Sequence, residues 1–131
     1  MRNIIAFAVV ITAMTVFASA PLAAEEIETE IVVSPNVINI ASKSTIVTVH
    51  TDIPFSAVVC SSVYLNTVEI NSWKADSRGF FVAKFLSSEV KGIVAADTTA
   101  TLALTGDLLE DGNTFFGTDD VTIINIEPNK R

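Results

Sequence analysis

Residues 44–51, with the sequence STIVTVHT, alternate between two kinds of side chain at every step. Val47 and Val49 fall on one face of an extended chain, while Ile46 and His50 fall on the other. A two-residue period carried by β-branched side chains is typical of a strand with one buried face. The stretch therefore predicts a β-strand.

Residues 98–105, TTATLALT, repeat this alternation, with Leu102 and Leu104 on one face. Shorter runs of β-branched and aromatic residues predict further strands at 27–33, 37–40, 63–65, 68–70, 80–85, 114–117 and 121–126, with 73–75 continuing the strand at 68–70. Turn residues separate the runs at 34–36, 66–67, 76–79 and 111–112. Gly79 suits a positive φ. This spacing of short strands and turns is typical of an all-β sandwich of about seven to nine strands.

Two segments between the predicted strands allow a helical turn. Residues 56–62 are ambiguous between a turn of helix and a strand, and 87–91 predict one helical turn closed by Gly92. No segment keeps an apolar period near 3.6 residues, so the pattern predicts no longer helix.

The N-terminal 24 residues have the three parts of a secretory signal peptide. A basic start containing Arg2 precedes an apolar run at 4–17, and small residues follow up to Ala24. The run is shorter than the roughly 20 residues that span a membrane. We expect cleavage after Ala24, because a cut after Ala20 would place Pro21 directly behind the scissile bond. An uncleaved anchor or a misread core segment are the alternatives.

The predicted mature chain, residues 25–131, is one domain's worth of sequence. It keeps all 15 acidic residues and seven of the eight basic ones, which gives a net charge of −8. Such a surface disfavours nucleic acid and anionic lipid. Cys60 and His50 are each the only residue of their kind, which excludes an internal disulfide and the usual zinc sets. Cys60 is expected to be a small buried residue, with an intermolecular disulfide or a reactive thiol as the alternatives.

Acidic residues are densest near the C-terminal end, and they are the candidate calcium ligands. They are Asp107, Glu110, Asp111, Asp119 and Asp120. If 108–117 forms a hairpin-like excursion, these carboxylates converge at one end of the sandwich. Their spacing lacks the ordered alternation of an EF-hand loop, and the other interpretation is a solvated turn with charges that discourage aggregation. A small hydrolase using Asp107, Glu110 and Asp111 is the enzymatic alternative, although no known catalytic motif occurs.

Tyr64 and Trp73 are the candidate ligand-binding aromatics. Together they supply the minimum for a platform on which a sugar ring stacks, since an aromatic face pairs with the apolar face of a pyranose. Both residue types more often anchor a core. A carbohydrate-binding module is therefore one of the alternatives for function.

Several segments together resemble small immunoglobulin-like β-sandwich modules of bacterial secreted and extracellular proteins. They are VSPNVINI at 33–40, KSTIVTV at 43–49, SVYLN at 62–66, DSRG at 76–79, TLALTG at 101–106 and GTDDV at 117–121. The resemblance covers roughly residues 32–126 and implies a spacer, adhesion or assembly unit. Related modules often carry an acidic calcium loop before the central strand. Here the equivalent loop offers only Asp76 beside Lys74 and Arg78, so the resemblance does not carry the metal site across.

Taken together, these patterns predict a periplasmic or secreted, non-catalytic binding or structural module with no cofactor. It would act through a sheet face or an edge strand on a protein partner or on a second copy of itself. The segment 27–33 lies near the expected new N-terminus, and it is the candidate for a swapped or donated strand.

Overall fold

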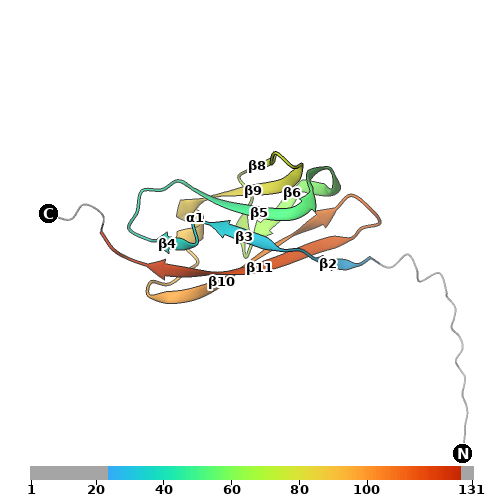
Figure 1. The fold of residues 1–131 in the computed structure, drawn as a ribbon. Coiled ribbons are helices and arrows are strands. Elements are labelled where there is room, and N and C mark those ends of the chain that lie inside the picture. Colours follow the sequence, from blue (N-terminus) through green and yellow to red (C-terminus); the bar gives the residue numbers. More distant parts are fainter. Residues whose placement is uncertain (1–23, 128–131) are drawn as a thin grey trace, which may run out of the picture.

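The structure is a computed structural model that describes residues 24–127. It is an all-β fold in which two sheets pack face to face in a sandwich-like arrangement (Figure 1). The all-β sandwich expected from the sequence is thereby confirmed. The predicted signal peptide, except for Ala24, lies outside the described residues. None of the helices in the described part of the chain is long and apolar enough to cross a membrane.

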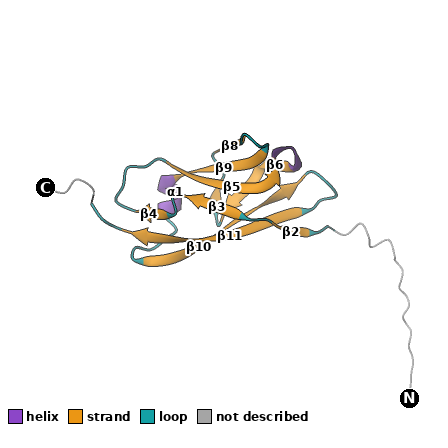
Figure 2. Cartoon of the chain, viewed as in Figure 1, coloured by secondary structure: helices purple, strands orange, loops and turns teal. Residues whose placement is uncertain are grey.

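The larger sheet is built around the long hairpin of β10 and β11. Its order is β2 (Glu26–Glu28), β11 (Thr114–Ile124), β10 (Thr98–Leu108), β6 (Val58–Leu65) and β7 (Val68–Glu69), and β4 (Val37–Asn39) also pairs with β11. The smaller sheet has the order β3 (Ile31–Ser34), β5 (Ile46–Pro54), β9 (Phe80–Leu86) and β8 (Ser72–Ala75). Two short helical segments, η2 (Phe55–Ala57) and α1 (Ser87–Lys91), lie between strands (Figure 2).

The core lies between the inner faces of the two sheets, as the alternation predicts. Val47 and Val49 of β5 and Leu102 and Leu104 of β10 belong to this core, and all four are fully buried. Three phenylalanines, Phe81, Phe85 and Phe115, are the largest fully buried side chains. The rings of Phe81 and Phe115 belong to opposite sheets and meet edge to face, with centroids 6.5 Å apart.

The predicted turns are confirmed with their backbone conformations. Gly79 has φ +88°, and the Asp111–Gly112 pair has φ 54° and 68°. The Asn113 amide donates to the Glu110 carbonyl at 2.9 Å, which closes the β10–β11 turn. Two consecutive positive φ angles inside such a turn match the twist of the flanking strands. Gly92 closes α1, as expected, by donating its amide to the Glu89 carbonyl. The ambiguous segment 56–62 is mostly strand, because only Phe55–Ala57 is helical.

Three sequence expectations about strand continuity are wrong. The segment 27–33 is two strands in different sheets, β2 and β3, and not one. The segment 114–126 contains one strand, Thr114–Ile124, and not two. Residues 73–75 do not continue the strand at 68–70, because the chain changes sheets: the Ile70 amide bonds to Val63, whereas the Asn71 amide bonds to Lys84 in the other sheet.

Candidate interaction surfaces

β2 lies at the outer edge of β11, where its backbone is hydrogen-bonded and its side chains remain exposed. Glu26, Ile27 and Glu28 are all exposed. β2 runs parallel to β11. The Thr114 amide donates to the Glu25 carbonyl at 2.9 Å, and the Thr29 amide donates to the Phe116 carbonyl at 2.8 Å. The strand is therefore held by main-chain bonds, each with a net worth of only about 1 kcal/mol.

Ile27 lies beside incompletely filled apolar space at one end of the sandwich. Its side chain keeps 40% of its surface exposed. It borders two hollows of about 390 and 400 Å³, whose shared lining includes Pro54, Ala57 and Leu108. Leu109 lines one of them and is 65% exposed. An extended chain on this edge of β11 therefore has apolar surface available beneath it that Ile27 does not cover.

Immediately after β2, the chain crosses from the larger sheet to the smaller one over Gly117. A Cβ atom at Gly117 would lie 2.6 Å from the Thr29 carbonyl oxygen and 2.7 Å from Cγ2 of Ile31. Only glycine allows this close approach of two backbones. Thr29 is 7% exposed, and its hydroxyl donates to Oδ1 of Asp52. The crossing is thus a packed and bonded junction, in contrast to the strand before it.

Asp119 forms a hydrogen bond to β3, the strand that follows this crossing. Its position opposite Leu102 places it on the inner face of β11. Its Oδ2 accepts a hydrogen bond of 2.9 Å from the Val33 amide of β3, in the other sheet. β3 pairs only with β5, so this carboxylate satisfies an amide on its otherwise open edge. The neighbouring Asp120 points outward and accepts from the Thr101 hydroxyl.

A polar hollow of about 600 Å³ lies at the same junction. Four of its lining residues are acidic, namely Glu28, Glu30, Asp52 and Asp119. Two of the four carboxylates are already used, Asp52 by Thr29 and Asp119 by Val33. Sequence reasoning did not single out this hollow. Its signal was the acidic alternation EEIETE at 25–30, whereas the sequence interpretation covered only 27–33, as a candidate swapped or donated strand.

The structure does not gather the five candidate calcium ligands at one place. In the β10–β11 ladder, Asp107 pairs with Thr114 near the turn, whereas Asp119 pairs with Leu102 farther along. Five residues of strand separate these positions, which is about 17 Å. Among the residues 24–127, no three His, Cys, Asp or Glu side chains form a group that could hold a metal ion. The expected convergence fails because β11 is one uninterrupted strand.

The two candidate aromatics lie on different sheets. Tyr64 is on β6, opposite Thr105, and points to the outer face of the larger sheet. Trp73 is on β8, opposite Ala83, and so lies on the inner side of the smaller sheet at its edge. Each keeps about two fifths of its surface exposed, 41% for Tyr64 and 42% for Trp73. They form no common platform.

Phe116 is the aromatic residue that the sequence reasoning missed. It lies opposite Thr105 from the other side, so Tyr64, Thr105 and Phe116 form one row across the outer face of the larger sheet. Two strand spacings separate the aromatic residues, about 10 Å. The signal was the pair Phe115-Phe116, of which one member faces the core and the other faces outward.

Cys60 and His50 occupy unremarkable positions for chemistry. Cys60 lies in β6, partly buried against the core, and burial raises the pKa of its thiol, with a hydrogen bond to backbone opposing that effect. The thiol is therefore in its neutral, less reactive form at neutral pH. His50 is exposed on the outer face of the smaller sheet, opposite Val32 and Val82.

Comparison with models of known families, with curated proteins and with solved structures gave no match to this chain. The interpretation of function therefore depends on the geometry of the molecule itself.

Proposed function

We propose that this chain is an exported, non-catalytic interaction module of the immunoglobulin-like type that binds an extended segment of another protein chain at the edge of β11. The incoming strand takes the place of β2 and directs an apolar side chain into the hollows beside Ile27. The module would work in the periplasm or outside the cell, because the leader of residues 1–24 has the pattern of a signal peptide. It needs no cofactor for this mode of binding.

One observation carries the proposal: β2 occupies a sheet edge while none of its three side chains is fully buried, and Ile27 keeps 40% of its surface exposed. Strand addition draws its affinity from main-chain hydrogen bonds and its specificity from pockets for alternate side chains. Both components are available here. β11 presents a ladder edge from Thr114 to Phe116, and the apolar lining of Pro54, Ala57 and Leu108 stands next to it.

A peptide titration tests this mechanism. The chain lacking residues 25–28 exposes the β11 edge, and it should bind a synthetic peptide of residues 25–28 with a weak, measurable affinity. A peptide with Ile27→Phe should bind more tightly, since it fills more apolar space, and one with Ile27→Asp should not bind. Equal affinity of the three peptides would show that the hollow beside Ile27 plays no part in binding.

A reversible lock tests the exchange in the full domain. Glu26 and Thr114 are register partners on neighbouring strands. A Glu26→Cys, Thr114→Cys pair is within bridging distance, since neighbouring strands lie about 4.8 Å apart. In a Cys60→Ala background, the oxidised protein should capture no strand-adding partner from the envelope or culture fluid, and reduction should restore capture. Identical capture in both redox states would contradict strand replacement.

A second candidate function, glycan binding, is supported by the row of Tyr64, Thr105 and Phe116. Aromatic side chains about 10 Å apart on the same sheet face provide two stacking positions for a polysaccharide. Binding to a polysaccharide panel should be lost on Tyr64→Ala or Phe116→Ala and kept on Trp73→Ala, which serves as the control. Loss with Trp73→Ala alone would reject the row as the binding surface.

A further inference from the structure

The charged residues of the strands are divided between the two sheets. The six strands of the larger sheet contain no Lys, Arg or His. Their acidic residues are Glu26, Glu28, Glu69, Asp107, Asp119 and Asp120. The strands of the smaller sheet carry Lys74, Lys84 and His50 and a single acid, Asp52.

The ladder register places most of the acids on the outer face of the larger sheet. Glu69 lies opposite Tyr64, and Glu28 lies opposite Phe116, both in the outward-facing row. Asp107 and Asp120 face outward on β10 and β11, and Asp119 alone turns inward. We call this surface the acidic face; it consists of Glu26, Glu28, Glu69, Asp107 and Asp120 around the row of Tyr64, Thr105 and Phe116.

The outer face of the smaller sheet carries the opposite charge on its β8–β9 hairpin. Lys74 lies opposite Val82, and Lys84 lies opposite Thr48 and Ser72, all on the outward side. Arg78, in the turn of the hairpin, lies over the ring of Phe80 at 5.1 Å. We call this surface the basic face; its members are Lys74, Arg78, Lys84 and His50. The acids Glu30 and Asp52 lie at the opposite margin of the same sheet, and Asp52 is bonded to Thr29.

Most of the charges on both faces lack a counter-charge within the described residues; Arg78 is the exception, because Asp76 lies beside it. In the part of the chain that the structure describes, the ammonium groups of Lys74 and Lys84 take part in no ion pair or hydrogen bond. The carboxylates of Glu28, Glu69 and Asp107 likewise have no side-chain partner among residues 24–127. Both faces also expose apolar surface, which includes Val32 and Leu86 on the smaller sheet and Tyr64 on the larger.

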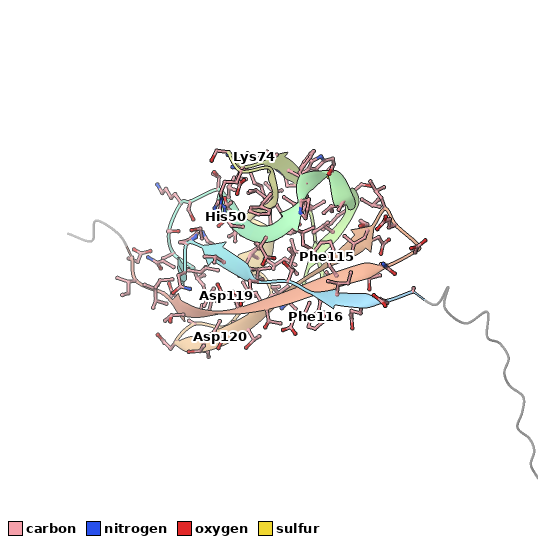
Figure 3. The ribbon with its side chains drawn as sticks, turned by 45° about the vertical axis from the view of Figure 1, so that its right-hand side comes forward. His50, Lys74, Phe115, Phe116, Asp119 and Asp120 are labelled. Carbon is pink, nitrogen blue, oxygen red and sulfur yellow. The ribbon has the colours of Figure 1, made fainter. Side chains whose placement is uncertain are left out.

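The two faces lie on opposite sides of the sandwich. Figure 3 shows His50 and Lys74 on one side of the molecule and Phe116 and Asp120 on the other. The intervening core separates them, so the acidic and basic faces of one molecule are not able to neutralise each other. A second copy of the same chain supplies the missing charge to each.

We propose that copies of this protein stack face to face in a head-to-tail row, with the acidic face of one copy on the basic face of the next. Such a contact is heterologous, and because the two faces are opposed it extends a row and does not close a dimer. Charge complementarity sets the orientation of the contact, while exposed apolar side chains such as Tyr64 and Val32 supply the buried area. The acidic face includes Glu26 and Glu28 of β2, but its other members lie on β7, β10 and β11, so the inference does not require the proposed strand addition.

The test measures the self-association of residues 25–131 by sedimentation over a range of protein concentrations. Lowering NaCl from 1 M to 0.01 M lengthens electrostatic screening from about 3 Å to about 30 Å. The mean mass should rise with concentration at low salt and fall to that of the monomer at high salt. A monomer at every concentration in 0.01 M NaCl would overturn the proposal.

Two charge reversals separate specific stacking from a simple effect of net charge. Lys74→Glu makes the acidic protein more negative, whereas Glu69→Lys makes it less negative. Net repulsion alone predicts that the first weakens association and the second strengthens it. Stacking predicts that both weaken it, by about two- to tenfold each. It also predicts that an equimolar mixture of the two variants recovers association, because the unchanged acidic face of the first meets the unchanged basic face of the second.

Lys43→Glu and Glu89→Lys are the matched controls, since each makes the same change of charge outside both faces. They should leave the association constant within about twofold of the wild type. A rise in association with Glu69→Lys, or equal effects of Lys74→Glu and Lys43→Glu, would reject the stacking arrangement. Neither result depends on the peptide titration at β11, so failure of one proposal is distinguishable from failure of the other.

Discussion

β2 and β3 are consecutive short strands, separated only by Thr29 and Glu30, yet their side chains differ in burial. In β2 every side chain is exposed. In β3 the pattern alternates, with Ile31 and Val33 buried in the core. β2 pairs with β11 at the edge of the larger sheet, whereas β3 joins the smaller sheet and faces the core.

The difference shows that hydrogen bonding to a sheet and packing into a core are separate properties of a strand. β2 has the first property, and β3 has both. Main-chain bonds to an exposed edge exchange for bonds to water at little net cost, while buried apolar area has no such substitute. An element that can leave its place without unfolding the domain is therefore expected at β2 and not at β3.

The most direct test of this difference is to truncate two isoleucines, Ile27 in β2 and Ile31 in β3. Ile31→Ala removes a side chain that is 6% exposed and leaves a cavity, so unfolding should become easier by about 2–4 kcal/mol. Ile27→Ala should change the stability by less than about 0.5 kcal/mol. Denaturant titration of both variants measures the difference. Equal losses would show that β2 is packed as firmly as β3.

The next largest effect is expected at the crossing between the two strands. Gly117→Ala introduces a Cβ that meets the Thr29 carbonyl at 2.6 Å, and a backbone atom cannot move aside as a flexible side chain can. We expect a loss of about 1–3 kcal/mol by the same titration. The control is Gly92→Ala, where the nearest atom would lie 3.4 Å away. A Gly117→Ala protein as stable as the wild type would mean that the strands are not held together at this point.

Two neighbouring aspartates sharpen the comparison further. Asp119→Ala removes the acceptor of the Val33 amide on β3 and leaves that amide unpaired, which should cost about 1–2 kcal/mol. Asp120→Ala removes an exposed bond to Thr101 and should cost about 0.5 kcal/mol or less. Hydrogen exchange should show faster opening at Val33 only in the first variant. A larger loss of stability in Asp120→Ala than in Asp119→Ala would show that the Asp119 carboxylate does not hold β3 in place.

The smallest expected effect lies in the β8–β9 turn, and it depends on pH. Hydrogen bonds from the Phe80 amide, and then the Arg78 amide and charge, lower the pKa of Asp76 despite some desolvation. A lowered pKa means that the charged carboxylate stabilises the fold above the unfolded pKa of about 3.9, and that this stability is lost as the pH falls. Asp76→Asn keeps the acceptor without the charge. Its melting temperature should therefore lie below that of the wild type at neutral pH, and the gap should close below about pH 4. A gap that does not change with pH would exclude the charge as the cause.

Much of the local structure could be predicted from the sequence. The alternation at 44–51 and 98–105 identified the buried faces of β5 and β10, and the turn residues identified Gly79 and the Asp111–Gly112 pair. The strand boundaries at 27–33 and 117–120 could not be predicted. Thr29–Glu30 continues an alternating pattern although the chain changes sheets there, and Gly117-Thr118-Asp119-Asp120 has the composition of a turn although it lies inside a strand.

The candidate sites followed the same division. Tyr64 is exposed, although the sequence favoured a core role for it, and the other aromatic residue of its row is Phe116 and not Trp73. Pairing across β10, and not distance along the chain, decides which side chains meet. The acidic residues 107–120 were expected to converge, yet an uninterrupted β11 spreads them along the hairpin. The acids that do surround a common hollow come from three separate segments of the chain, at 28–30, 52 and 119.

By itself, the sequence determined that this protein is built from short strands with one apolar face, because a two-residue period is a local property that any window of the chain displays. Only the tertiary structure decided which sheet each strand joins and that acids and bases face opposite sides of the sandwich. It also decided that Gly117 lies inside β11, where the chain after β2 crosses over it, and not in a turn. These features depend on pairs of residues far apart in the chain, such as Val33 with Asp119. A local sequence pattern does not indicate which distant residues pair.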